Sequence, residues 1–153
     1  ARALLPGLID RGSGYFVNVT SAAGLLNQIG DAAYSATKHA AVSFAESLAI
    51  SHGDDGIGVS VVCPQYVATP LIGLDASDTK DHADLLTAEE VALSIVAGIE
   101  RRQFLILPHP AAAIYVQRRA EDHNLWIEVM RRLRAKSLSQ LGVSQIAELY
   151  RLV

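Results

Sequence analysis

Three short apolar runs, separated by longer stretches of helical pattern, constrain the fold of this chain more than any other feature. The runs cover residues 15–20, 57–63 and 104–107 and are rich in β-branched and aromatic side chains. Runs of this kind are typical of strands that are buried on both faces. Because a helical stretch separates each run from the next, consecutive strands are expected to pair in parallel through right-handed crossovers. The sequence therefore predicts an α/β fold, a Rossmann-like open parallel sheet of about three strands flanked by helices.

Four segments carry the spacing of apolar residues expected of helices: residues 1–9, 32–51, 87–102 and 111 onward. The clearest helix start is Thr87, an N-cap residue with Glu90 at the capping-box position. Residues 73–84 are polar and are predicted as a loop. The pattern divides the chain into an α/β domain over residues 1–110 and a helical C-terminal extension over residues 111–153.

Composition and charge exclude several classes of function. The net charge of −3 gives no electrostatic reason to expect nucleic acid or an anionic membrane as partner. No apolar run reaches the ~18 residues of a membrane span. The single cysteine, Cys63, forms no internal disulfide and is predicted to be a small core residue, which fits a cytoplasmic protein. The five histidines are spaced too widely for a local metal site, so no metal is expected.

Tyr34 and Lys38 form the pair that carries the most chemical information. They lie four residues apart on a predicted helix, so both side chains leave the same face. A tyrosine ordinarily keeps its proton until pH ~10, and a nearby ammonium favours the phenolate. Lysine is scarce in this chain, with only three residues, and one of them has this spacing. Pairs of this kind are common on helix surfaces, so the neighbouring segments decide its meaning.

The predicted topology brings two further segments to the same place. Ser21 follows the first strand, and residues 64–69 follow the second. The helix that carries Tyr34 connects these two strands. In open parallel sheets, ligands bind beyond the carboxyl ends of the strands. We therefore expect the three segments to converge on one edge of the sheet.

At this point the sequence resembles the C-terminal half of the short-chain dehydrogenase/reductase family, over about residues 1–110. The resemblance rests on Tyr34-x-x-x-Lys38, on Ser21 thirteen residues upstream in a Val-Thr-Ser-Ala-Ala-Gly segment, and on Pro64-x-x-Val67-x-Thr69-Pro70 after the next strand. The family implies an oxidoreductase that transfers a hydride between NAD or NADP and an alcohol or ketone.

The resemblance also implies a role for each matching residue. Tyr34 would be the general acid/base, and Lys38 would favour its phenolate and bind the nicotinamide ribose. Ser21 would hold the substrate oxygen as charge develops on it. Pro64, Val67 and Thr69 would lie beside the nicotinamide, with the Val67 backbone and Thr69 holding its carboxamide.

The sequence departs from the family pattern in two ways. The loop after the second strand usually reads Pro-Gly, and here Gln65 replaces the glycine. Gln65 and Tyr66 are expected to border the substrate pocket. The Gly-rich phosphate-binding turn is absent, and no Asn stands in residues 1–9, where the family places a catalytic one. We therefore expect the chain to be incomplete, to bind dinucleotide poorly in isothermal titration, and to be inactive alone.

Two readings other than an active dehydrogenase remain. The chain fits a catalytically incompetent scaffold of the same fold that acts through oligomerisation, since the small-residue helix 32–51 suits a subunit interface. By analogy with the family, a homodimer or homotetramer is expected. Ser35-Ala36-Thr37-Lys38 also spells the Ser-x-x-Lys motif of serine β-lactamases, but the companion motifs are missing.

Overall fold

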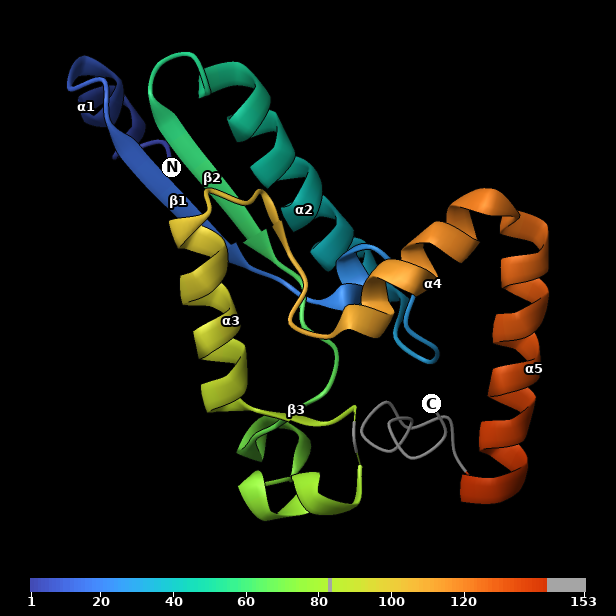
Figure 1. Ribbon diagram of the computed structural model, residues 1–153. Helices are drawn as coiled ribbons and strands as arrows, with labels where there is room; N and C mark the ends of the chain where they lie inside the picture. Colours follow the sequence, from blue (N-terminus) through green and yellow to red (C-terminus); the bar gives the residue numbers. More distant parts are fainter. Residues whose placement is uncertain (83, 143–153) are drawn as a thin grey trace.

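A parallel sheet of three strands forms the centre of the computed structural model, which describes residues 1–82 and 84–142 (Figure 1). The strands are β1 (Gly14–Val19), β2 (Ile57–Val62) and β5 (Leu105–Ile106). Their order is β1-β2-β5, and β1 pairs with β2 along its whole length. The predicted open parallel sheet is confirmed, and each strand overlaps its predicted apolar run.

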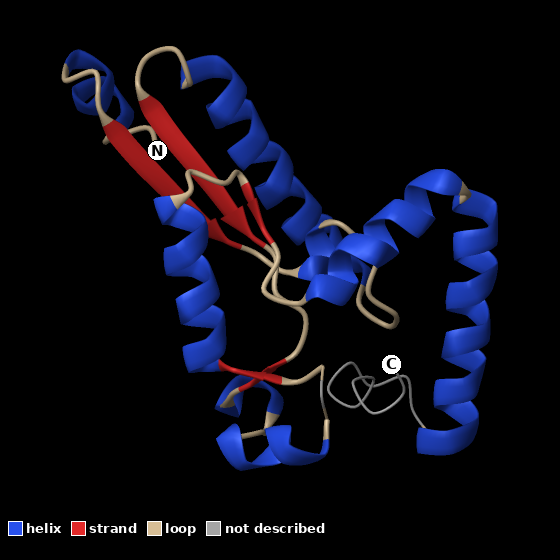
Figure 2. Cartoon of the chain, in the orientation of Figure 1, coloured by secondary structure: helices blue, strands red, loops and turns tan. Residues whose placement is uncertain are grey.

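Helices cover both faces of this sheet (Figures 1 and 2). Those in the described residues are α1 (Leu5–Asp10), α2 (Ala32–His52), α3 (Ala88–Glu100), α4 (Pro110–Glu121) and α5 (His123–Leu141). The predicted capping box begins α3: Thr87 Oγ1 accepts from the Glu90 amide at 3.1 Å, and the Glu90 carboxylate accepts from the Thr87 amide at 2.8 Å. The two helices that flank the sheet, α2 and α3, therefore lie where the sequence predicts them.

The helix boundaries differ from the prediction at both ends of the chain. Helix α1 begins at Leu5 rather than at the first residue, because Pro6 suits only the first turn of a helix. The predicted helical extension after residue 111 is divided at Asp122, a position that the sequence did not indicate; its backbone is extended and its side chain accepts from the Leu125 amide at 2.9 Å. Asp122 therefore ends α4 and caps α5. The last part of the predicted extension, residues 143–153, lies outside the described residues.

Short elements appear where the sequence predicts a loop. A 3-10 helix, η3 (Ala76–Asp81), lies within the predicted loop 73–84 and begins with a capping box between Asp75 and Asp78. Two strands of two residues each, β3 (Val67–Ala68) and β4 (Leu86–Thr87), pair in parallel on either side of it. Strands this short carry no readable periodicity, so the sequence did not reveal them. Their pairing holds together the two ends of the segment between residues 68 and 86.

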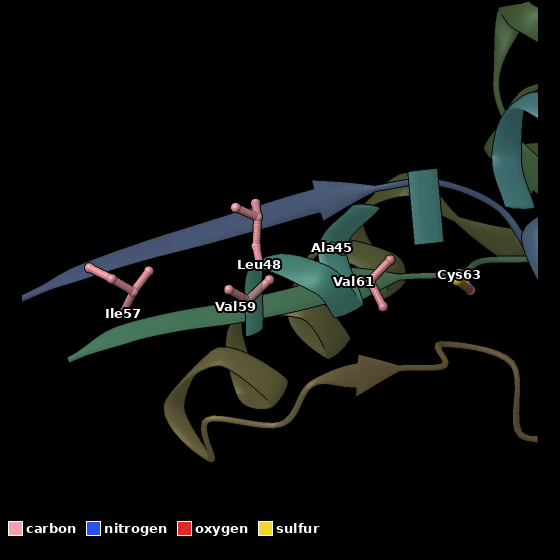
Figure 3. Close-up of a cluster of buried hydrophobic side chains, with 6 residues drawn as sticks. All are labelled: Ala45, Leu48, Ile57, Val59, Val61 and Cys63. Atoms are coloured by element: carbon pink, nitrogen blue, oxygen red, sulfur yellow. The ribbon is translucent and has the colours of Figure 1, made fainter. Parts of the chain in front are cut away.

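The apolar core lies between α2 and the facing side of β2 (Figure 3). Its buried members are Ala45, Leu48, Ile57, Val59, Val61 and Cys63. Cys63 is fully buried, as predicted, and burial raises the pKa of its thiol. On the opposite face α3 approaches β5 closely, since a Cβ at Gly98 would lie 2.5 Å from Ile106 Cδ1. Helices α2 and α3 thus pack on opposite faces of the sheet and hold the carboxyl ends of its strands in place.

Strand β1 forms an edge of the sheet. In the described part of the chain it pairs with β2 alone, and its Val17 and Val19 side chains are 41% and 62% exposed. In the neighbouring strand, Val61 and Val62 are fully buried. Exposed apolar side chains on an edge strand are unusual at a solvent-facing surface. Within the described residues, β1 therefore presents an exposed apolar edge. No helix within the described ranges has the length and apolar character required to cross a bilayer.

Candidate active site

Ser21 lies directly beyond the carboxyl end of β1, where a short 3-10 helix, η1 (Ala22–Gly24), begins. Its Oγ accepts a hydrogen bond from the Ala23 amide at 3.1 Å, which makes Ser21 the N-cap of η1. The Ala22 amide donates to the Pro64 carbonyl at 2.7 Å. The loop that carries Ser21 is therefore joined to the loop that follows β2. Because the Ser21 oxygen accepts from its own loop, its hydroxyl hydrogen remains available to donate elsewhere.

Gly24 allows this serine loop to contact α2. A Cβ at position 24 would lie 2.7 Å from the Lys38 carbonyl oxygen and 2.9 Å from Val42 Cγ2. No side chain larger than hydrogen fits that gap without moving the helix backbone. The absence of a side chain at Gly24 thus places the serine loop against the turn of α2 that contains Lys38.

Tyr34 and Lys38 project from the first two turns of α2. The Asp31 carboxylate caps this helix by accepting from the Tyr34 amide at 2.8 Å. Lys38 Nζ lies over the Tyr34 ring, 5.4 Å from its centroid. Tyr34 is 36% exposed. The structure therefore brings the tyrosine and the cation together, on the same face of one helix.

The loop after β2 is held by a histidine more than 40 residues further along the chain. His109 follows β5; its Nδ1 accepts from the Gln65 amide at 3.1 Å, and its Nε2 donates to the Tyr66 carbonyl at 2.9 Å. These two bonds together require a neutral ring with its proton on Nε2. His109 is 2% exposed. Burial lowers the pKa of His109, while the hydrogen bond to Tyr66 and the charges of Asp84 and Glu90 act in the opposite direction.

Sequence reasoning missed the role of His109. It was grouped with the other histidines as too isolated for a metal site, whereas its ring forms hydrogen bonds to the backbone atoms of Gln65 and Tyr66. The signal that points to it is its position directly after the third strand, at the edge of the sheet where Ser21 and Pro64 also lie. Among the described residues, no group of three or more acidic, histidine or cysteine side chains is arranged to hold a metal ion.

The predicted pocket residues Gln65 and Tyr66 are partly buried and chemically distinct. Gln65 Nε2 is buried and has no hydrogen-bond partner among the described residues. A buried donor of this kind is costly unless a ligand or another chain accepts from it. Burial raises the pKa of Tyr66 to about 12, opposed by a hydrogen bond from the Gln28 side chain. Tyr66 therefore stays protonated near neutral pH and is unsuited to proton transfer.

The predicted cofactor residues lie together in the segment from Pro64 to Thr69. Val67 begins β3, and Thr69 Oγ1 donates to the Val67 carbonyl at 3.3 Å. The Pro64 carbonyl is occupied by the Ala22 amide. The segment is thus fixed at its start by the serine loop, in its middle by His109, and at its end by the β3–β4 pair.

Comparison with known proteins identifies the family. Residues 1–80, more than half of the 153-residue chain, match the family described as short chain dehydrogenase. The chain therefore belongs to the short-chain dehydrogenase family. It is 32% identical over 124 residues to 1-deoxy-11-beta-hydroxypentalenate dehydrogenase from Streptomyces exfoliatus. The matched region covers 80% of this chain and 45% of that relative.

Solved structures confirm the Rossmann-like fold. A short chain dehydrogenase/reductase from Burkholderia phymatum in complex with NAD is 30% identical, with a TM-score of 0.67 over 81% of this chain and 53% of that one. A short-chain dehydrogenase from Sphingobium yanoikuyae in complex with NADPH is 24% identical, with a TM-score of 0.64 over 81% of this chain and 49% of that one, and supports the fold alone. The chain thus spans about half the length of these relatives.

Proposed function

We propose that the protein containing this chain is an NAD(P)-dependent oxidoreductase that transfers a hydride between the nicotinamide and an alcohol or ketone. One observation carries the proposal: Lys38 Nζ lies 5.4 Å from the Tyr34 ring centroid, on the helix against which the Ser21 loop packs. Membership of the short-chain dehydrogenase family supports the same chemistry. The family relation alone leaves the substrate open.

The proton-transfer roles follow from the groups at this edge of the sheet. Tyr34 Oη donates a proton to the carbonyl oxygen during reduction and removes it from the alcohol during oxidation. The Lys38 ammonium favours the phenolate that forms in reduction. Ser21 keeps its hydroxyl hydrogen free and donates it to the same substrate oxygen as negative charge develops there.

The residues of the loop after β2 fit a nicotinamide cofactor. Gln65 Nε2, which is buried and has no hydrogen-bond partner among the described residues, would offer a donor beside the nicotinamide, and the Val67 backbone and Thr69 would hold its carboxamide. Pro64 would border the ring, and Lys38 would reach the ribose hydroxyls. When bound, the nicotinamide donates or accepts the hydride. NAD and NADP both remain candidates, since the similar structures contain one or the other.

Substitution of Tyr34 by phenylalanine tests the proposal in the full-length protein. We expect kcat on a panel of alcohols and ketones to fall by about 10²–10⁴-fold, because the proton donor is lost while the ring remains. Cofactor binding, measured by titration calorimetry, should change little. The matched control is Tyr115→Phe, since Tyr115 on α4 is not among the residues assigned to this site. Equal activity of the two variants would contradict the proposal.

A second candidate is a scaffold that acts through self-association. Two large apolar side chains of α2, Phe44 and Ile50, are 51% and 79% exposed. Their exposure favours burial against a second copy, as expected for a homodimer or homotetramer. Light scattering of the full-length protein, with Phe44→Ser as variant, measures this association. Retained assembly with no turnover of any substrate by the unmodified protein would favour the scaffold over the enzyme.

A further inference from the structure

A hollow of ≈ 290 Å³ lies between α5 and the loop that precedes α2, apart from the candidate active site. One face of α5 forms its wall, because the lining positions repeat at spacings of three and four: His123, Trp126, Ile127, Met130, Arg131 and Arg134. Loop residues 27–30 face them. The Arg119 guanidinium of α4 also lines the hollow and donates to the Leu25 carbonyl, which ties α4 to this loop (Figure 1).

The charge of this hollow is opposite to that of the chain as a whole. Arg119, Arg131 and Arg134 line it, and no carboxylate is among its described lining residues, although the net charge of the chain is −3. In the described part of the chain, Arg131 and Arg134 have no ion-pair partner; the ion pair on α5 joins Arg132 to Glu128. Guanidinium groups recognise oxyanions through paired N–H donors. The free positive charge therefore favours an anionic ligand.

Part of the wall of the hollow is apolar. Trp126 is partly buried and its ring lies 6.4 Å from that of Tyr115 on α4, centroid to centroid. Met130 of α5 and Ile29 of the opposite loop extend this apolar surface. Pockets that bind small molecules combine an apolar lining with a few polar groups that orient the ligand. The arrangement suits a ligand with an apolar body and a charged end.

Gln28 connects the hollow with the candidate active site. It lines the hollow, its amide donates to Ser35 Oγ at 2.9 Å, and its side chain hydrogen-bonds the Tyr66 hydroxyl. Ser35 follows Tyr34 directly on α2. One residue therefore contacts the hollow, the tyrosine helix and the loop after β2. A ligand that fills the hollow would contact Gln28, which is bonded both to the tyrosine helix and to the loop after β2.

We infer that this hollow binds an amphipathic carboxylate, with Arg131 and Arg134 contacting the anionic group and Trp126 contacting the apolar body. The assignment of this carboxylate to the substrate rests on the proposed function. It makes the substrate class a hydroxy acid or keto acid whose charged end is remote from the reacting carbon.

Fluorescence of Trp126, the single tryptophan of the chain, tests binding without any turnover. The full-length protein is titrated with hexanoate and, separately, with hexanamide, which has the same length and no charge. Trp126→Phe isolates the signal of this residue. We expect a saturable change with hexanoate and a response at least tenfold weaker with hexanamide, because only the carboxylate engages the arginines.

Paired variants locate the binding site. Arg131→Gln with Arg134→Gln is expected to weaken hexanoate binding at least tenfold, whereas Arg132→Gln, which alters a paired arginine on the same helix, should leave it within about twofold. Both arginines are exposed, so the double variant keeps the fold, which circular dichroism checks. Equal responses to hexanoate and hexanamide, or binding unaffected by the double variant, would overturn the inference. Hexanoate binding is also measured for Tyr34→Phe, which is expected to bind it like the unmodified protein. This measurement distinguishes a failure of the inferred binding site from a failure of the proposed function.

Discussion

The two halves of the candidate active site lie at the same edge of the sheet and are held in very different ways. Tyr34 and Lys38 extend from one helix, and Tyr34 is 36% exposed. The loop at Gln65 and Tyr66 is fixed by two hydrogen bonds from His109, which is 2% exposed and comes from 43 residues further along the chain. We call the Tyr34–Lys38 pair the open half of the candidate site and the loop held by His109 its built half.

This difference separates what each half needs for function. A preorganised loop contributes through position, so its loss is expected to appear in stability and in kcat together. The tyrosine half contributes through charge, so its loss is expected in catalysis with little effect on folding. Substitutions in the two halves should therefore affect stability and catalysis differently. The four predictions below run from the largest expected effect to the smallest.

Removal of the cation beside Tyr34 is the strongest test of the open half. Lys38→Met in the full-length protein is expected to lower kcat by about 10²-fold or more, equivalent to roughly 2.7 kcal/mol of transition-state stabilisation. Steady-state kinetics measure the loss. Lys136→Met, on exposed α5, is the control; an equal loss there would remove the special role of Lys38.

Removal of His109 tests the built half. His109→Ala leaves the Gln65 amide without its acceptor and removes one of the hydrogen bonds to the Tyr66 carbonyl, which also accepts from the Leu86 amide at 3.4 Å. A buried group left unsatisfied costs about 1–3 kcal/mol. We expect the free energy of unfolding to fall by about 2–4 kcal/mol in urea denaturation. His52→Ala, which loses only a surface pair with Asp55, should cost about 1 kcal/mol or less. Similar losses in the two variants would show that the loop does not depend on His109.

Gly24 sets the contact between α2 and the serine loop, which is in turn bonded to the Pro64 carbonyl of the loop after β2. Gly24→Ala places a methyl group 2.7 Å from the Lys38 carbonyl oxygen, and overpacking of this kind costs about 1–3 kcal/mol. Thermal unfolding measures the loss. Gly7→Ala is the matched control, because a Cβ at Gly7 in α1 has nothing within 4 Å and alanine favours a helix by about 0.5–1 kcal/mol. A neutral Gly24→Ala would mean that the serine loop is not held against α2.

The smallest expected effect is a pH dependence of stability. Burial lowers the pKa of His109 below its ordinary 6.5, so below pH 6.5 the unfolded chain binds the proton more readily than the folded one. The stability held by the neutral ring is complete above pH 6.5 and decreases as pH falls, by at most about 1.4 kcal/mol per pH unit. Urea midpoints at pH 7.5 and 5.5 measure it. In His109→Gln the change in urea midpoint between the two pH values should be smaller. An equal change in both proteins would contradict the prediction.

Much of this arrangement could be predicted from the sequence because it depends on local patterns. Three apolar runs predicted the parallel sheet, and Tyr34 with Lys38 predicted a shared helix face. His109 was missed because its partners are backbone atoms, which leave no trace in side-chain spacing. The break at Asp122 was missed for a related reason, since neither proline nor glycine marks it and only the cap to Leu125 shows it.

The open edge of β1 has a practical consequence for anyone who handles this chain. Within the described residues, the outer side of β1 offers unpaired amides and carbonyls beside the exposed Val17 and Val19. Such an edge recruits extended peptide from any source, including other copies of the same chain. Aggregation at high protein concentration is the expected outcome, and a charged residue in place of Val19 is the simplest way to make the chain tractable in solution.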